Sequence, residues 1–288
     1  MLKDPAGVRF VLLHYHFFKN AGTTIEEILA HTFFENYARL DTDDFDGAVS
    51  QEQLVTFLER HPRTKAVSSH QFRYPVPTVP GYIFFDLCFL RDPIDRIRSM
   101  YDYFREKPIP GEPASDLARE KSIGAFIAEL VEQHTYRVSN VQVNLLANGI
   151  VNDPPADADL IRAIEVMRKT SFLGVVDCFN ESLVAGQYFL RPVYPNLALA
   201  QQPANVSSAS RMDTFRKACD ADVYKELLRL NALDLELVAL ARAEVHRRFS
   251  MVADGPARLR ELGEASLAST RTSTSSQTGP ASESSPDP

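Results

Sequence analysis

Short apolar runs alternate with helical patterns along most of the chain. The first run, residues 8–15, has the β-branched and aromatic side chains typical of a strand. After a polar segment, Ile25, Ile28, Leu29 and Phe33 recur at the spacing that places side chains on one face of a helix. The chain therefore opens with a predicted strand, a loop of small residues and an amphipathic helix.

Three later segments have the length and composition of strands, namely residues 65–69, Tyr82–Leu90 and residues 171–176. The run Tyr82–Leu90 is almost continuously apolar, as expected of a parallel strand buried on both faces. Pro93 then suits the first turn of a helix that extends to about Phe104, since that position needs no N–H donor. Further helices are predicted at Gln51–Arg60, 123–134, 139–147, Asp157–Lys169, 180–190, 214–229 and 232–249. Strands that alternate with helices predict an α/β fold with a central parallel sheet.

The composition is that of a globular protein with an unusual end. The chain has 288 residues, of which 44% are hydrophobic and 24% charged. No linker-like segment interrupts residues 8–250, so we expect one domain over residues 1–254. In residues 255–288, Ser and Thr become abundant and large apolar side chains become scarce. Such a segment cannot offset the entropy of ordering, which predicts a disordered tail.

The charge balance limits the classes of partner. The 31 Lys and Arg residues stand against 38 Asp and Glu residues, a net charge of −7. Proteins that coat nucleic acid carry a basic surplus, so no nucleic-acid partner is expected. A small anionic ligand is compatible with this balance, because it responds to the local field of a cleft. No apolar stretch is long enough to span a membrane, and no signal-peptide pattern opens the chain, so a cytoplasmic location is expected.

The cysteines indicate neither disulfides nor a metal site. Cys88, Cys178 and Cys219 are odd in number and widely spaced, and the first two lie in apolar runs. This pattern favours buried free thiols. Neither Cys-x-x-Cys nor His-Glu-x-x-His occurs, so no metal is predicted.

The loop after the first strand has the composition of an anion-binding turn. It consists of Lys19, Asn20, Ala21, Gly22, Thr23 and Thr24, and is called the first turn below. Small residues let the backbone approach a ligand, and the free amides of the following helix favour an anion there. Thr23 or Thr24 can cap that helix, and Glu26 and Glu27 suit its opening residues. The alternative is an ordinary capped strand–helix turn with a surface lysine.

A second turn, residues 91–99, follows the run Tyr82–Leu90. Arg91 lies at the end of that strand, where its guanidinium can grip a phosphate with two hydrogen bonds. Ser99 lies about two helical turns further on and could face the same ligand. For Arg96 and Arg98 we favour a solvated helix face with intrahelical ion pairs.

These two turns carry a resemblance to a known family. The first reads Lys-Asn-Ala-Gly-Thr-Thr, and residues 90–99 read Leu-Arg-Asp-Pro-x-x-Arg-x-x-Ser. In this order they resemble the sulfotransferases, and more narrowly the carbohydrate branch with the heparan sulfate 2-O- and 6-O-sulfotransferases. Residues 172–182, 205–207 and 231–249 resemble later segments of that family. Phe18 stands where proline is frequent and Ala21 where glycine is frequent, but neither change removes a donor.

The resemblance implies a fold, a donor and a reaction. The fold would be a P-loop-like three-layer α/β/α arrangement, and the donor 3′-phosphoadenosine 5′-phosphosulfate (PAPS), without a metal. The first turn would hold the 5′-phosphosulfate, and Arg91 and Ser99 the 3′-phosphate. Lys19 is placed to neutralise the leaving oxygen in an in-line displacement. The acceptor would be a hydroxyl, of a glycan or a small molecule.

Sulfuryl transfer to a hydroxyl needs a general base, and histidine suits that role. His70 follows the short strand at 65–69 and should lie at the same sheet edge as Lys19. The carbohydrate sulfotransferases that the chain resembles place a catalytic histidine after the comparable strand, which makes His70 our first choice. His16 is the second choice and could instead orient the loop. Arg73, in the Pro-rich loop that follows, and residues 136–140 are weaker candidates for the acceptor side.

Two other functions are compatible with the motifs. An ATP-using kinase of related fold is disfavoured, because no Gly-Lys-Ser/Thr loop and no evident magnesium-binding carboxylate pair occur. A non-catalytic nucleotide-binding relative is disfavoured, because Lys19, His70, Arg91 and Ser99 are all present.

Overall fold

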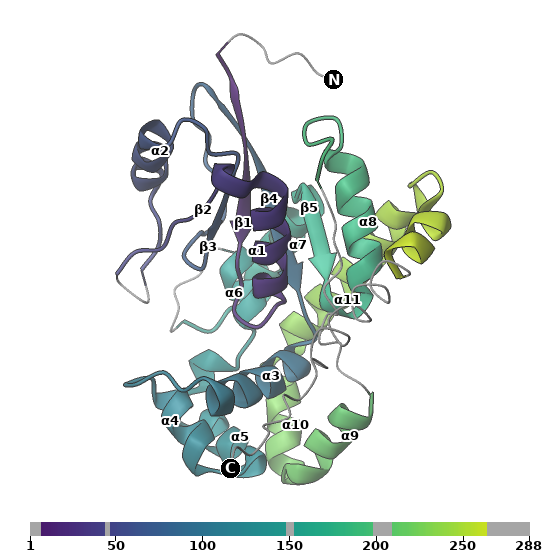
Figure 1. The fold of residues 1–288 in the computed structure, drawn as a ribbon. Coiled ribbons are helices and arrows are strands. Elements are labelled where there is room, and N and C mark those ends of the chain that lie inside the picture. The colour runs from purple at the N-terminus through teal and green to yellow at the C-terminus, as the bar shows by residue number, and fades with distance from the viewer. Residues whose placement is uncertain (1–6, 44–46, 148–152, 198–208, 264–288) are drawn as a thin grey trace, which may run out of the picture.

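A five-stranded, all-parallel sheet forms the centre of the protein, seen in a computed structural model that describes residues 7–43, 47–147, 153–197 and 209–263. Its order is β2-β3-β1-β4-β5 (Figure 1). The strands are β1 (Arg9–Tyr15), β2 (Tyr37–Arg39), β3 (Ala66–Ser69), β4 (Tyr82–Leu90) and β5 (Phe172–Val175). The predicted α/β class with a central parallel sheet is confirmed.

The register brings the carboxyl ends of the strands to one edge. Tyr15 at the end of β1 is opposite Ser69 at the end of β3, and Leu90 at the end of β4 is opposite Val175 at the end of β5. The loops that follow these strands therefore start close together, which is where parallel α/β sheets bind ligands.

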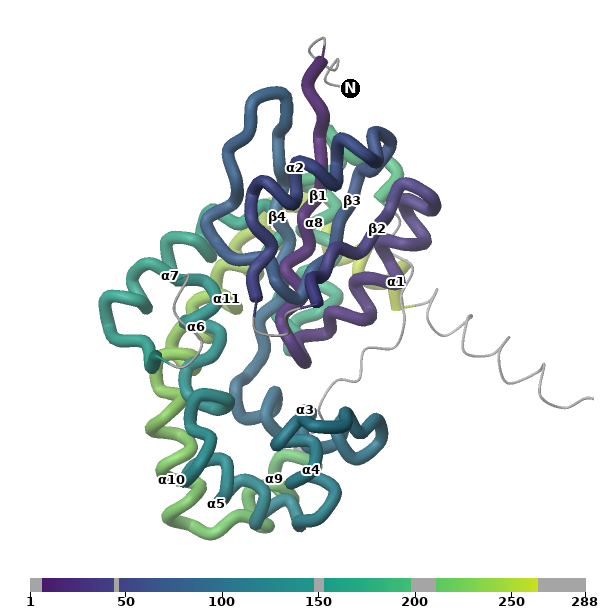
Figure 2. Tube along the Cα trace, turned by 90° about the vertical axis from the view of Figure 1, so that its left-hand side faces the viewer, coloured from purple at the N-terminus to yellow at the C-terminus, as the bar shows by residue number. Residues whose placement is uncertain are grey.

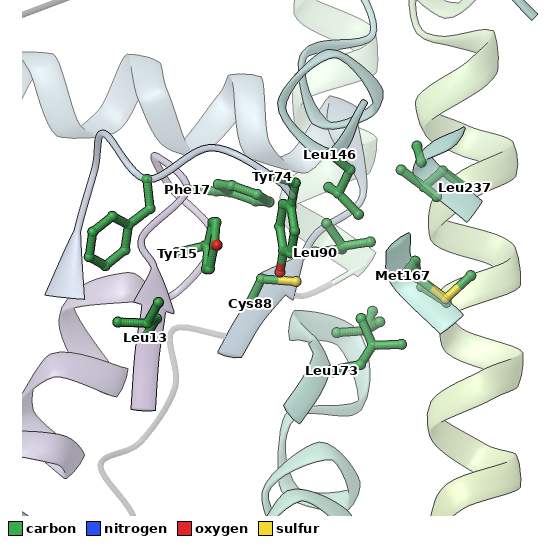
Figure 3. Packing of buried hydrophobic residues seen from close by; sticks show 14 of the residues in the cluster. Leu13, Tyr15, Phe17, Tyr74, Cys88, Leu90, Leu146, Met167, Leu173 and Leu237 are labelled. Atoms are coloured by element: carbon green, nitrogen blue, oxygen red, sulfur yellow. The ribbon is translucent and has the colours of Figure 1, made fainter. Parts of the chain in front are cut away.

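Helices cover both faces of the sheet, as the alternation of side chains along a strand requires. On one face, Leu12 and Leu87 pack with α1 (Gly22–Phe33) and α8 (Phe179–Leu190). On the other, Leu13, Tyr15 and Leu90 pack with residues of the helices opposite (Figure 3). Those helices are α2 (Gln51–Arg60), α6 (Val141–Leu146), α7 (Asp157–Lys169) and α11 (Ala232–Ser250). Seen from the side, the sheet lies between α1 and the pair α6 and α7 (Figure 2).

A separate group of helices packs below the carboxyl edge of the sheet (Figures 1 and 2). It comprises α3 (Pro93–Glu106), α4 (Pro113–Glu120), α5 (Ile123–Gln133), α9 (Ala209–Ala218) and α10 (Ala221–Leu230). Their shared core includes Ile97, Phe126, Phe215 and Leu227, and Phe18 of the loop after β1 packs against it. The helices of this group therefore lie next to the loops at the carboxyl edge of the sheet.

Most predicted elements lie within one or two residues of the observed ones, but a few predictions are wrong. The helix predicted over 214–229 is two helices, because Asp220 ends the first pattern and caps α10 by accepting hydrogen bonds from the amides of Asp222 and Val223. The eight-residue helix α4 and the three-residue strand β2 were not predicted, and β2 is too short to show a period.

The folded part of the chain continues past residue 254, the predicted domain boundary. Residues 255–263 are helical, and Leu259 and Leu262 pack against the cluster of Val184 and Val252. The rest of the predicted tail lies outside the described residues. The three cysteines are free, and Cys88 and Cys178 are buried, as predicted. Among the described residues, no helix has the length and apolarity to cross a membrane.

Candidate active site at the carboxyl edge of the sheet

The first turn has an unusual backbone held by a buried side chain. Lys19 and Ala21 have positive φ values of 64° and 62°, which cost a residue with a side chain about 1 kcal/mol or more. Asn20 between them is 1% exposed, and its Nδ2 donates to the Phe89 carbonyl and to Gln142 Oε1, both at 2.8 Å. The side chain of Asn20 thus serves to hold the turn, and it points away from any ligand on the surface.

The start of α1 presents backbone donors. Its N-cap is Ala21, which has no capping side chain, so the predicted caps Thr23 and Thr24 are wrong. The first hydrogen bond runs from the Ile25 amide to the Ala21 carbonyl. The helix therefore offers no acceptor to the amides of Gly22, Thr23 and Thr24. Unpaired amides at a helix N-terminus form a favourable environment for an anion.

Lys19 adds a positive charge to the first turn, and its environment lowers the pKa of its ammonium group. Its Nζ lies 4.2 Å from the centre of the Tyr103 ring, a cation–π contact that orients the ammonium group. Burial, and next the nearby charge of Arg91, lower the pKa of Lys19 to about 8, while Glu106 opposes the shift. Lys19 is therefore mostly charged at neutral pH, but it can lose its proton slightly above it.

Arg91 ties the second turn to the first. One guanidinium nitrogen donates to the Lys19 carbonyl at 2.8 Å, and Nε donates to Asp95 Oδ2 at 2.7 Å. The residue is 5% exposed, so it lies beneath the surface. Ser99 follows Asp95 by one helical turn and is half-buried. The two predicted turns are in contact.

The prediction of a solvated face for Arg96 and Arg98 is wrong. Both are buried, because the helices below the sheet cover this side of α3. Arg98 does form the predicted intrahelical ion pairs, with Asp95 and Asp102. Arg96 donates to the Arg137 carbonyl at 3.1 Å, and burial lowers its pKa to about 10.

Three histidine rings stack next to the first turn. His16 stacks on His70 with ring centres 3.9 Å apart, and on His14 with ring centres 5.3 Å apart. The His16 ring also lies against the backbone of Gly22, where an added Cβ would come within 1.8 Å of Cδ2. The position of the His16 ring therefore leaves room only for glycine at position 22. The sequence pattern did not reveal this steric constraint. His16 connects the first turn to His70.

Each ring has its own polar partner. Asp41 Oδ1 accepts a hydrogen bond from the His70 amide at 2.9 Å, and Asp41 Oδ2 lies 3.5 Å from His70 Nδ1. His16 Nδ1 is 3.0 Å from Glu26 Oε1, and His14 Nδ1 is 2.9 Å from the Ser68 hydroxyl. With Nδ1 of His70 facing a carboxylate, its Nε2 is the ring nitrogen available to another group.

These contacts also set the charges of the cluster. Burial, and next the neighbouring His16, lower the pKa of His70, while Asp41 opposes them. Burial lowers the pKa of His14 well below its ordinary value. Burial alone would raise the pKa of Asp41, but hydrogen bonds from the His70 amide and its neighbours leave it below the ordinary value. The arrangement favours a neutral His70 beside an ionised Asp41 at neutral pH.

His14, His16 and Glu26 also offer ligand atoms within 4.8 Å of one another, which raises the question of a metal. The two imidazole planes are within 18° of parallel and stacked. A metal ion binds in the plane of each ring, at about 2.1 Å from the nitrogen, and stacked rings share no such point. The cluster would hold a metal only after one ring had turned.

The weaker candidates for the acceptor side are engaged with the protein itself. Arg73 donates to the His70 carbonyl at 3.0 Å, and its neighbour Tyr74 is buried against Tyr15. In segment 136–140, the Arg137 side chain pairs with Glu112, and Asn140 accepts hydrogen bonds from the first amides of α11. Residues 205–207 lie outside the described residues.

Four residues organise this site in roles that the sequence pattern did not predict, namely Glu26, Asp41, Gln142 and Asp234. Asp41 and Glu26 hold the histidines, but nothing in the local pattern distinguishes them from surface acids. Gln142 and Asp234 are both 0% exposed. Asp234 shares a helix face with Leu237, Val238 and Ala241, so an acid within an apolar stripe was the available signal.

The sequence is similar to a protein whose name gives no function. The sequence matches no protein-family model. It is similar to an uncharacterized protein of Archaeoglobus fulgidus, with 26% identity over 243 residues, which cover 80% of this chain and 94% of that protein. The similarity thus extends over nearly the whole of that protein, whose name states no function.

Proposed function

We propose that this chain is a sulfotransferase that moves the sulfuryl group of PAPS to an acceptor hydroxyl, of a carbohydrate. The observation that carries the proposal is the contact between the two turns: Arg91 of the second donates to the Lys19 carbonyl of the first. A donor with phosphates at both ends of its ribose needs two anion-binding turns side by side. His70, whose ring stacks on that of His16 next to the first turn, supplies a base at the same edge of the sheet.

The donor set suits such an anionic ligand. The amides of Gly22, Thr23 and Thr24 and the ammonium group of Lys19 would hold the 5′-phosphosulfate. The hydroxyl of Ser99 and the charge of Arg91 would serve the 3′-phosphate. Because Arg91 is bound to Asp95 and to Lys19 O, we infer that it acts largely by ordering the turn and through its field.

When bound, PAPS supplies an activated sulfuryl group. Lys19 stabilises negative charge that develops at the first turn. His70 Nε2 accepts the proton of the acceptor hydroxyl, and the Asp41 carboxylate stabilises the imidazolium that results. Turnover therefore requires a neutral His70 and a charged Lys19, which is the state that the cluster favours near neutral pH.

The charges near His70 bear on the acceptor. Arg39 is exposed and lies 3.4 Å from Glu26 and 3.6 Å from Asp41, which together balance its charge. The whole chain carries a net charge of −7. These charges favour a neutral or lightly charged glycan over a heavily sulfated polymer.

Ligand-induced stabilisation tests the proposal. The purified protein is titrated with adenosine 3′,5′-bisphosphate and, separately, with Mg-ATP, and thermal unfolding is followed. At about 100 times Kd, the bisphosphate should add about 2.7 kcal/mol to the free energy of unfolding. Lys19→Ala and Ser99→Ala should weaken this effect, whereas Arg162→Ala on the exposed face of α7 should not.

The outcomes separate the candidate functions. No stabilisation by the bisphosphate would overturn the proposal, and stabilisation by Mg-ATP alone would indicate a kinase. Bisphosphate binding without transfer from PAPS to any acceptor in a glycan and small-molecule screen would indicate a non-catalytic relative. His70→Ala should lower turnover by about 10²–10⁴ while donor affinity is kept. An active His70→Ala enzyme would move the role of base to His16.

A further inference from the structure

The side chain of Gln142 lies between the two turns, although it belongs to neither. Its Oε1 accepts hydrogen bonds from Asn20 Nδ2 at 2.8 Å and from the Arg91 amide at 2.9 Å. Its Nε2 donates to the Arg91 carbonyl at 2.8 Å. One side-chain amide therefore pairs with both backbone groups of Arg91 and holds Asn20 of the first turn.

Asp234 determines the orientation of that amide. Its Oδ2 accepts from Gln142 Nε2 at 3.3 Å and from the Gln142 backbone amide at 3.0 Å, and its Oδ1 accepts from the Val143 amide at 2.8 Å. An ionised Asp234 carboxylate accepts hydrogen bonds and cannot donate them. It therefore holds the Nε2 of Gln142 on the Asp234 side and leaves the Oε1 of Gln142 facing Asn20. Asn140 in turn accepts from the amides of Leu233 and Asp234, so the starts of α6 and α11 cap each other.

The network is buried, and all of its donors and acceptors named above are paired, although Asn20 Oδ1 has no hydrogen-bond partner among the described residues. Gln142 and Asp234 are 0% exposed and Asn20 is 1% exposed. Neither an aliphatic residue nor glutamate at position 142 could both accept from two N–H groups and donate to two oxygens. A buried amide with this number of contacts rigidifies its surroundings, because each unmade bond would be costly.

We propose that Gln142, oriented by Asp234, is a positioning residue that sets the separation of the first and second turns and thereby the affinity for a ligand that occupies both. The inference rests on the proposed function for the identity of that ligand. A ligand with two anionic groups gains from binding both only when the two sites are held at the matching distance. Gln142 acts through Asn20 and Arg91 and is not itself a ligand-binding residue.

Comparison of ligands with one and two phosphates provides the test. Dissociation constants are measured for adenosine 3′,5′-bisphosphate, 5′-AMP and 3′-AMP with the wild type, Gln142→Met and Gln142→Glu. Both variants should lose about tenfold or more in affinity for the bisphosphate, and about two-fold or less for 5′-AMP, which needs the first turn alone. Ser182→Ala, which removes another fully buried hydrogen-bonding group, should leave the ratio of the affinities unchanged.

An equal loss of affinity for all three ligands, or an unchanged ratio of their affinities in the folded variants, would overturn the inference.

Hydrogen exchange measured without ligand separates the failure of this inference from the failure of the proposed function. Peptides that cover residues 17–24 should exchange faster in Gln142→Met than in the wild type, even if the wild type binds no bisphosphate. Unchanged exchange there would overturn the positioning role, whereas absent bisphosphate binding by the wild type would overturn the proposed function. If the variants do not fold, Asn20→Ala, which removes one end of the network, takes their place in both measurements.

Discussion

Replacement of Gly22 by alanine tests the contact between the first turn and the histidine stack. The new Cβ would lie 1.8 Å from Cδ2 and 2.0 Å from Nε2 of His16. The ring is 7% exposed, packed between His14 and His70, and bound to Glu26, so it has no free space in which to turn.

The magnitude follows from three terms. Insertion of a methyl group into a packed site costs about 1–3 kcal/mol, and a lost hydrogen bond between His16 and Glu26 costs about 1 kcal/mol more. The higher helix propensity of alanine returns about 1 kcal/mol, because Gly22 belongs to α1 and is not among the glycines with a positive φ. The net expectation for Gly22→Ala is a loss of roughly 1–3 kcal/mol in the free energy of unfolding.

The sign of the effect should reverse when His16 is removed. In a His16→Ala background the clash is absent, so Gly22→Ala should stabilise the protein by about 0.4–1 kcal/mol. Urea unfolding of the four proteins of this cycle, followed by far-UV circular dichroism, gives the two differences. Gly263→Ala serves as a control, because nothing lies within 4 Å of the Cβ it would add. A stabilising Gly22→Ala in the wild-type background, equal to that in His16→Ala, would refute the described contact.

Three further predictions concern charge and burial. Because the pKa of Lys19 is about 8, affinity for the bisphosphate should fall as the pH rises from 7 to 9.5, and Lys19→Arg should flatten this dependence, which calorimetry at several pH values measures. Asp41→Asn removes a charge that raises the pKa of His70, so the acid limb of the kcat/KM profile should move to lower pH; a limb that stays in place would argue against His70 as the base. Ser182→Ala leaves the buried Val175 amide without its acceptor and should cost about 1–3 kcal/mol in urea unfolding, without a change in m.

Local patterns were sufficient for the elements and for the two turns. Tyr82–Leu90 and Asp157–Lys169 were predicted with the observed bounds, because a buried strand and an amphipathic helix each impose a period on neighbouring residues. The order of strand, small-residue loop and helix placed Lys19 and Arg91 at the carboxyl edge, since parallel strands end on the same side. The break at Asp220 depends on the side chain of that residue, which caps α10 by accepting hydrogen bonds from the amides of Asp222 and Val223.

What the sequence alone determined is the class of the fold and the position of the candidate chemistry along the chain, because both follow from residues close in sequence. The tertiary structure decided which charges are buried and which side chains meet. Arg96 and Arg98 look solvated by their local pattern, and only helices packed from elsewhere in the chain cover them. Gln142 meets Asn20 across 122 positions of sequence, and no local period records such a contact. These long-range contacts set the separation of the two turns, and on that separation the proposed binding of the donor depends.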